Sequence, residues 1–380
     1  MVPEEIENLL AKKIIICVGP GGVGKTTVSA MLGLTCKKLG KKAICVTVDP
    51  SERLAESLGL RKSPAPEPGK KEIYRRNEPL ENRIHNVAEG LDAMIIHGPW
   101  VIDRALSKYI PEDKWEIVSS GRIYPYMRQT LRGMHELASM VLVNDLLTMN
   151  QWDCVIVDTA PSAHAIDFLE MPRRIIQAIR SPAVRIFMRG SPVSIPGAAL
   201  LSRASALILR AAGRIVGADF LTEVAQFLTL NKESLENICT AAESIKENLR
   251  GGGACIVQVT SAKALSVDET LFLHDKISGE GFFTLLIAIN RVLPLAPPPG
   301  GENVALEERP ETGDSGLDAR IARNFEEMCL IAQVEEKEIE RLTDHTPTVP
   351  SYLKIPLLEH DVYSIPMLNK LLDRIEVHHP

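Results

Sequence analysis

A glycine-rich turn between an apolar run and a helical pattern constrains this chain more than any other segment. The turn spans residues 19–27 and reads Gly-Pro-Gly-Gly-Val-Gly-Lys-Thr-Thr, and the run 14–18 before it is apolar and β-branched. Residues 28–34 continue as a helical pattern. A strand, a turn ending in Gly-Lys-Thr and a helix form the phosphate-binding loop of P-loop nucleotide triphosphatases. A chance match is disfavoured because the required strand and helix flank the turn.

The loop predicts which residues contact a nucleotide. Its backbone amides and the amino end of the following helix would surround a phosphate with positive charge. Lys25 would reach the β- and γ-phosphates, and the Thr26 hydroxyl would bind Mg²⁺. We therefore expect the nucleotide to contact Gly21, Gly22, Val23, Gly24, Lys25, Thr26 and Thr27.

Composition and charge exclude several classes of protein. The 380 residues could form one large α/β domain or a core with a subdomain, and a net charge of −6 argues against broad nucleic-acid binding. The acidic amino terminus differs from a signal peptide, and no run of about 18 apolar residues predicts a membrane-spanning helix. Seven scattered cysteines without a Cys-x-x-Cys pair indicate free thiols in a reducing cytoplasm and no zinc site.

Apolar runs separated by helical patterns predict a doubly wound, mainly parallel α/β sheet. Five apolar runs predict core strands, at residues 13–18, 43–48, 154–157, 254–259 and 283–289. A sixth strand is expected near residues 352–355. We treat residues 1–380 as a single ATPase-type domain whose nucleotide-binding core comes from 10–60, 150–170, 252–292 and 345–375. Two stretches, 91–149 and 173–250, look helical and predict an inserted helical subdomain. Segments 63–69 and 294–316 read as mobile loops.

Acidic residues follow two of the predicted strands. Asp158 ends an apolar strand in the arrangement that holds Mg²⁺ beside a phosphate loop. Asp49 follows another predicted strand, at the sheet edge where its carboxylate could contact the metal ion or the attacking water. A helix-capping role for Asp49 is the alternative. Asn290 also ends a strand, and an amide there could contact a purine edge.

Residues 198–216 form an amphipathic, basic helical pattern. Three interpretations stay open: packing into the protein's own core, a groove for an apolar client helix, or a surface for anionic membrane.

Together these motifs resemble the family of ArsA, the arsenite-pump ATPase, and of the related ATPase that delivers tail-anchored membrane proteins. The phosphate loop matches the family's Gly-Lys-Gly-Gly-Val-Gly-Lys-Thr-Thr except at Pro20, and residues 158–165 resemble its second switch. The resemblance implies ATP and Mg²⁺ as cofactors, Asp49 as the residue that polarises the hydrolytic water, and Asn290 and Pro356 as adenine contacts. It also implies a homodimer.

Three departures from the family affect this expectation. Pro20 replaces a lysine that reaches the partner subunit's phosphates, so we expect either a dimer held mainly by the helical subdomains or an arginine such as Arg53 or Arg173 as the bridging cation. The region after Asn290 lacks the family's zinc-binding cysteines. The sequence also shows no cysteine cluster of the kind that holds arsenite.

We expect a cytoplasmic ATPase whose hydrolysis drives a conformational switch coupled to a membrane protein or an apolar polypeptide client. A nucleotide-dependent holdase or targeting factor for apolar helices is the alternative. A P-loop phosphotransferase fits less well, because the sequence shows no acid–base or substrate-phosphate residues for it.

Overall fold

The fold is described from a computed structural model of the whole chain. The described residues are 3–48, 58, 79–96, 99–121, 124, 134–182, 184, 232–250, 252–294, 315–362 and 364–378.

The centre of the molecule is a nine-stranded sheet with the order β3-β4-β2-β5-β1-β6-β7-β8-β9. The strands are β1 (Ile14–Val18), β2 (Ala43–Thr47), β3 (Ile84–Ala88), β4 (Leu91–Ile95), β5 (Cys154–Asp158), β6 (Ala254–Ser261), β7 (Thr284–Val292), β8 (Tyr352–Pro356) and β9 (Glu376–His378). From β4 to β8 in this spatial order, which includes β2 and β1, neighbouring strands pair in parallel. Strands β3 and β9 pair antiparallel at the two edges. The predicted doubly wound, mainly parallel sheet is confirmed.

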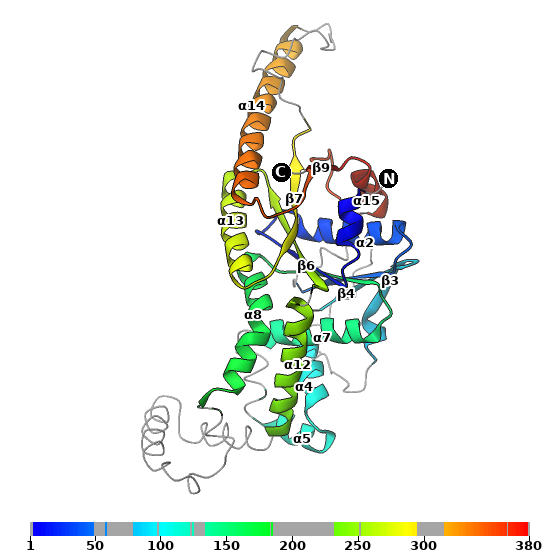
Figure 1. Cartoon of the computed structure of the whole chain (residues 1–380). Coiled ribbons are helices and arrows are strands. Elements are labelled where there is room, and N and C mark those ends of the chain that lie inside the picture. Colours follow the sequence, from blue (N-terminus) through cyan, green and yellow to red (C-terminus); the bar gives the residue numbers. More distant parts are fainter. Residues whose placement is uncertain are drawn as a thin grey trace.

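Helices cover both faces of this sheet (Figure 1). Helices α1 (Glu4–Leu9), α2 (Lys25–Lys38) and α15 (Ile365–Leu372) share one hydrophobic core with the sheet. The opposite core includes α4 (Pro99–Tyr109), α5 (Glu112–Ser120), α7 (Met134–Met149), α8 (Ser162–Ile179), α12 (Lys232–Arg250) and α13 (Ala264–Gly279). A short 3₁₀ helix spans Leu80–Arg83, and α14 (Ser315–His345) packs by its carboxyl-terminal half on a third, smaller core.

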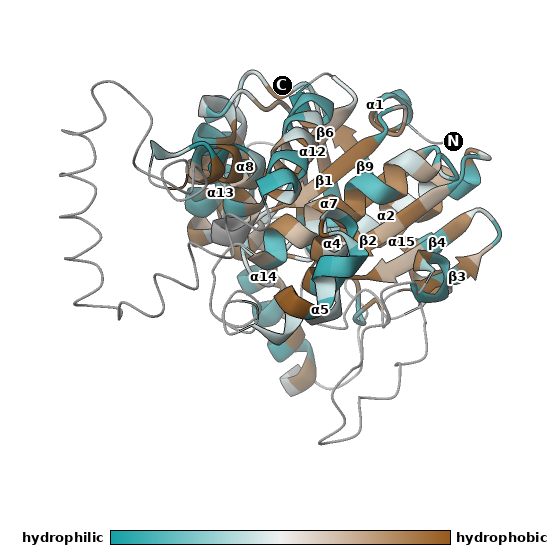
Figure 2. Ribbon diagram, turned by 90° about the horizontal axis from the view of Figure 1, so that it is seen from below, coloured by the Kyte–Doolittle hydropathy of each residue, from teal (hydrophilic) through white to brown (hydrophobic). Residues whose placement is uncertain are grey.

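Alternation along each central strand builds the two large cores. In β1, Ile14 and Ile16 face the α7 and α8 side, while Ile15 and Cys17 face α2. A strand that is buried on both faces must be apolar throughout, which explains the uninterrupted apolar run in the sequence. Figure 2 shows these strands in brown between helices that carry teal outer faces.

The structure corrects the sequence prediction at three places. Residues 91–95 form β4, which pairs in parallel with β2, so this part of the expected helical stretch is a strand. Strand β3 pairs with it through a turn at Gly90, and β9 adds a three-residue edge strand; neither was predicted. Helix α14 begins at Ser315, inside the expected loop 294–316.

The described parts of the stretches 99–149 and 173–250 are largely helical, but whether they act as a separate subdomain stays a prediction. The loop 63–69 and the amphipathic segment 198–216 lie outside the described residues. In the described part of the chain, no helix has the length and apolarity needed to cross a membrane.

Candidate nucleotide-binding site

The glycine-rich turn joins β1 to α2 at the carboxyl edge of the sheet, as predicted. Gly24 precedes the helix with φ of 98°, a left-handed conformation that favours glycine, and no side chain caps the helix there. The amino end of α2 therefore presents its positive pole toward the loop. Such an end attracts an anion, which is the physical basis of phosphate binding at this type of turn.

Lys25 folds back over the loop. Its Nζ donates to the carbonyl oxygens of Gly19 at 3.2 Å and Pro20 at 2.9 Å, and the residue is only 7% exposed. A buried ammonium group is unfavourable unless it is hydrogen-bonded, so these carbonyls hold the cation inside the loop. A phosphate is a stronger acceptor for it than a neutral carbonyl.

Asp158 links the loop to the neighbouring strands. Its Oδ2 accepts hydrogen bonds from the hydroxyl groups of Thr26 at 2.8 Å and Thr47 at 3.3 Å, and the residue is 1% exposed. Strands β5 and β2 bring Asp158 and Thr47 into register, and α2 supplies Thr26 from its first turn. Hydroxyl and carboxylate oxygens are hard donors, so this set fits Mg²⁺.

Asn290 lies two residues before the end of β7, and its amide is turned toward the loop. Its Nδ2 donates to the carbonyl oxygen of Val23 at 2.8 Å, and the residue is 6% exposed. A Cβ on Gly24 would lie 2.1 Å from that nitrogen, so only glycine fits beside it. Pro356 lies at the same edge, paired with Val292. Asn290 therefore braces the loop backbone, while its contact with adenine, like that of Pro356, stays a prediction.

The second switch begins beside the loop. Thr159 donates through its hydroxyl to the carbonyl oxygen of Cys17 at 2.8 Å, and a Cβ on Gly21 would come within 4.0 Å of Pro161. Burial is the main cause that raises the pKa of the Cys17 thiol to about 12. Cys17 is therefore a neutral packing residue under the site.

Three site residues were missed at the sequence level. Thr47 and Thr159 each follow or end an apolar strand, and their position next to Asp49 and Asp158 is the signal that could have found them. Arg291 has a left-handed backbone with φ of 63°, and its guanidinium lies 3.5 Å from the carbonyl oxygen of Gly22. Nothing in the sequence marks that conformation.

Two of the residues named from the sequence, Asp49 and Arg53, lie outside the described residues. Arg173, the other suggested bridging cation, lies on α8, and its Nη1 donates to both carboxylate oxygens of Glu280, at 3.0 and 2.8 Å.

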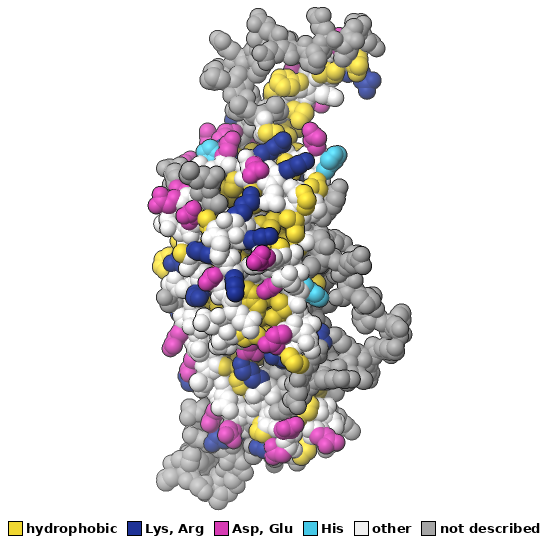
Figure 3. Space-filling model, turned by 90° about the vertical axis from the view of Figure 1, so that its right-hand side faces the viewer, with side chains coloured by type: hydrophobic (Ala, Val, Ile, Leu, Met, Phe, Trp, Pro, Cys, Tyr) yellow, Lys and Arg dark blue, Asp and Glu magenta, His cyan; other side chains and the backbone are white. Residues whose placement is uncertain are grey.

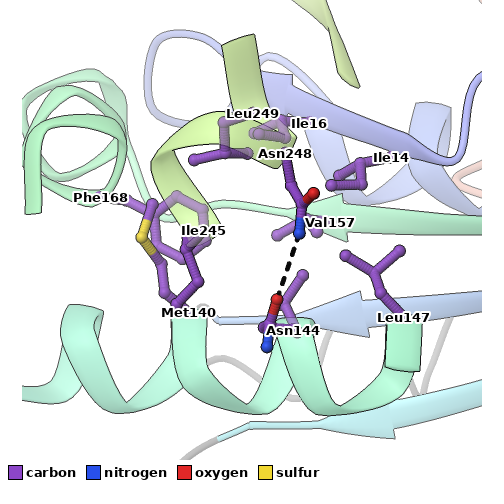
Figure 4. A pocket seen from close by; sticks show the side chains of 11 residues that line it. Ile14, Ile16, Met140, Asn144, Leu147, Val157, Phe168, Ile245, Asn248 and Leu249 are labelled. Carbon is purple, nitrogen blue, oxygen red and sulfur yellow. Dashed lines mark hydrogen bonds between the residues drawn. The ribbon is translucent and has the colours of Figure 1, made fainter. Parts of the chain in front are cut away.

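A separate cavity lies between β1, β5, α7, α8 and α12 (Figure 4). Its volume is about 20 Å³, and Asn248 donates to Asn144 across it at 3.5 Å. A water molecule needs about 10–15 Å³ of such volume, so the cavity is far too small for a nucleotide. The phosphate loop remains the candidate site.

Comparison with known proteins agrees with this assignment. A family model described as anion-transporting ATPase matches residues 12–340. The putative arsenical pump-driving ATPase 1 of Aquifex aeolicus is 26% identical over 374 residues, which cover 96% of this chain and 78% of that protein. The ATPase get3 of Schizosaccharomyces japonicus is 30% identical over 182 residues, 47% of this chain and 50% of that protein.

Proposed function

Because the chain belongs to the anion-transporting ATPase family and is an ATPase, we propose that Mg²⁺-dependent ATP hydrolysis at the loop 19–27 drives a conformational switch coupled to a membrane protein or an apolar polypeptide. The observation that supports this most directly is the convergence of Lys25, Thr26 and Asp158 at one sheet edge. A pump-driving role is named for the Aquifex relative, and for this chain it is part of the proposal.

In the proposed reaction, Lys25 leaves the carbonyl groups of Gly19 and Pro20 and binds the β- and γ-phosphates of ATP. Thr26 and Asp158 would hold Mg²⁺, which neutralises phosphate charge. Asp49 would orient the attacking water, as the family resemblance implies. Asn290 and Pro356 would contact the adenine.

The second switch offers a path from the phosphates to the helices. Pro161 lies beside Gly21 and immediately precedes α8. Helix α8 is tied to α13 by the pair of Arg173 with Glu280 and to α12 by the pair of Arg180 with Glu243 at 2.6 Å. A shift of the switch on loss of the γ-phosphate would therefore move α8 with its neighbours.

The test compares ATP hydrolysis and ATP affinity in purified variants. We expect Lys25→Ala to abolish hydrolysis and weaken binding, because alanine lacks the ammonium group that would bind the β- and γ-phosphates. Asp49→Asn should keep ATP bound but slow hydrolysis, since it removes the charge that orients water. Lys37→Ala, an exposed position on the same helix, is the matched control. Wild-type turnover in Lys25→Ala would reject the site.

A further inference from the structure

Arg291 has an unusual backbone conformation for a residue with a long side chain. Its φ of 63° lies in the left-handed region, and among the described residues Asn150, with φ of 52°, is the only other non-glycine residue there. Asparagine visits this region more readily because its short polar side chain can bond locally. The pairing of β7 with β8 also shifts register between Asn290 and Val292, so Arg291 is an extra residue in β7 at a β-bulge.

The bulge brings Arg291 to the same loop that Asn290 contacts. In a regular strand, neighbouring side chains point to opposite faces of the sheet. Here the Asn290 amide donates to the carbonyl oxygen of Val23 at 2.8 Å, and the Arg291 guanidinium donates to that of Gly22 at 3.5 Å. Two consecutive residues of β7 therefore reach two consecutive residues of the phosphate loop. Bulges beside active sites re-aim a side chain in this way.

The surrounding structure holds the chain in place after Arg291. The carbonyl oxygen of Val292 accepts a hydrogen bond from the backbone nitrogen of Leu357 at 2.8 Å, and the backbone nitrogen of Leu293 donates to Glu335 of α14 at 2.9 Å. A strained residue persists only where its neighbours determine its conformation. Glycine would adopt the same conformation without the steric cost, so the arginine side chain needs a reason of its own.

The contacts of the guanidinium with the protein are too loose to supply that reason. The distance of 3.5 Å to Gly22 is long for a hydrogen bond, and the fully exposed Asp361 carboxylate lies 4.0 Å away. An exposed ion pair of this kind contributes little to stability. Figure 3 shows Lys and Arg side chains mixed with Asp and Glu over one face of the molecule, so an exposed cation is common here. The strained backbone is what distinguishes Arg291.

We propose that the guanidinium of Arg291 packs on the face of the purine base of the bound nucleotide. The inference rests on the proposed nucleotide site, in which Asn290 and Pro356 contact the adenine. Arg291 lies between these two contacts, directly after Asn290 and directly before Val292, which pairs with Pro356. A guanidinium is planar and delocalised and stacks on aromatic rings, whereas a lysine ammonium group is a compact point charge.

The position of Arg291 favours the base over the phosphates as its partner. The phosphates are expected at the loop amides, the amino end of α2 and Lys25. Arg291 instead donates to a loop carbonyl oxygen, next to the residue that Asn290 contacts. Stacking on a ring face does not depend on the hydrogen-bonding edge of the base, so Arg291 would serve adenine and guanine alike. The choice between those two bases is then left to Asn290.

The affinities of Arg291→Gly for nucleotides test this inference, because glycine removes the guanidinium and fits the backbone conformation. Titration calorimetry with Mg²⁺ would give the Kd of ATP, GTP, UTP and inorganic triphosphate for the full-length proteins. We expect about tenfold weaker binding of ATP and of GTP, a smaller loss for the smaller ring of UTP, and no loss for inorganic triphosphate, which has no base. Arg291→Lys should resemble the glycine variant, since it keeps the charge without the planar group.

Asn150→Gly is the matched control. Asn150 also has a positive φ, but it lies in the turn between α7 and β5, at the amino end of β5 and away from the loop. Both glycine variants should melt at or above the temperature of wild type, because each relieves a positive φ. Only Arg291→Gly should lose nucleotide affinity.

The outcomes separate this inference from the proposed function. A wild-type protein that binds none of the nucleotides would reject the proposed function itself. Unchanged affinities in Arg291→Gly would overturn the inference alone. Equal losses for ATP and inorganic triphosphate, or full recovery in Arg291→Lys, would assign the arginine to the phosphates or to the loop and overturn the base contact. A melting temperature of Arg291→Gly below that of wild type would show that the side chain stabilises the fold, which also contradicts the inference.

Discussion

At the residue scale, the site depends on a few buried polar contacts around the loop. Lys25, Asp158 and Asn290 are each less than 8% exposed, and each bonds to the loop backbone or to a threonine. Buried polar groups without partners are costly, so these hydrogen bonds hold the three side chains in one arrangement. The sequence predicted all three residues, because each follows or ends an apolar run at a known edge. It could not predict that Lys25 rests on carbonyl oxygens or that the Asn290 amide turns toward Val23.

Asn290 has two candidate roles that nucleotide selectivity can separate. As an adenine contact, it would distinguish ATP from GTP, whose base edge presents a different donor and acceptor order. As a brace, it supports Val23 whichever base is bound. We expect Asn290→Ala to lower ATP affinity by about tenfold and to reduce the preference for ATP over GTP, consistent with loss of about 1 kcal/mol or more per hydrogen bond.

The measurement is the Kd of ATP and of GTP for wild type and variant. Equal losses for the two nucleotides would show that Asn290 acts only by bracing the loop. Asn86→Ala, an exposed asparagine on β3, serves as the control.

At the element scale, the central strands were predictable and the edge strands were not. A strand buried on both faces is apolar throughout, and β1, β2 and β5 each show that pattern. Strand β3 is at most half-buried and contains His85 and Asn86, so its composition resembles a loop. Strand β9 has only three residues and is defined by its pairing with β8. Pairing between distant segments is not visible in the local sequence.

Close packing of α2 on the sheet predicts the effect of one substitution. A Cβ on Gly33 would lie 2.5 Å from the Cys45 sulfur and 2.9 Å from a Leu91 methyl group. Alanine gains about 1 kcal/mol of helix propensity over glycine, but overpacking costs about 1–3 kcal/mol. Because Cys45 and Leu91 are fully buried, we expect Gly33→Ala to destabilise the protein by about 1–2 kcal/mol.

Denaturant unfolding measures this effect. Gly279→Ala is a matched control, since it lies in α13 and its Cβ would meet nothing within 4 Å. That variant should be neutral or more stable. Equal stability of the two variants would show that the side chains around Gly33 move aside to accommodate the added methyl group.

The contact of α13 with β6 predicts a dependence of stability on pH. Gln258 Nε2 donates to Thr284 at 2.7 Å and lies 3.1 Å from His274 Nδ1, so the hydrogen-bond network assigns Nδ1 as an acceptor. Burial lowers the pKa of His274, against the opposing charge of Asp275. The unfolded chain therefore binds a proton at higher pH than the folded protein does. Stability is full above pH ~6.5 and falls as the pH drops through that value toward the lower folded-state pKa.

Thermal unfolding between pH 8 and pH 5 tests this expectation in wild type and His274→Gln. The glutamine can accept from Gln258 but cannot be protonated, so its Tm should fall less steeply with decreasing pH. Parallel curves for the two proteins would show that His274 does not contribute to acid sensitivity.

At the scale of the whole molecule, the candidate nucleotide contacts and the base of α14 share one edge of the sheet. The loop 19–27, Asn290 and the base of α14 all lie at the carboxyl ends of the parallel strands. This is the edge where open α/β sheets bind ligands. In the proposed switch, a change at the phosphates would reach two helices: α8 through Pro161, and α14 through Leu293.

The distribution of thiols over the molecule predicts that arsenite does not stimulate ATP hydrolysis. The fold gathers five cysteines on the α2 side of the sheet, which sequence spacing alone did not assemble: Cys17, Cys36, Cys45, Cys154 and Cys255. All five are at most 3% exposed. Burial raises the pKa of Cys17 and Cys255 to about 12, so these thiols stay protonated at neutral pH. Arsenite and antimonite need accessible sulfur ligands held together, and a closed core does not offer them.

We therefore expect micromolar arsenite or antimonite to change turnover by less than about twofold, because a ligand can shift the switch only by its differential affinity for the two states. Thiol titration of the folded protein supplies an independent readout. Of the seven cysteines, only Cys329 on α14 is partly exposed, so one thiol should react quickly and six slowly. Several-fold activation that disappears in Cys→Ser variants would contradict the expectation and favour a metalloid-driven pump. Fast reaction of several thiols on adding ATP would show that the nucleotide opens the α2 side of the sheet, since buried thiols react only when exposed.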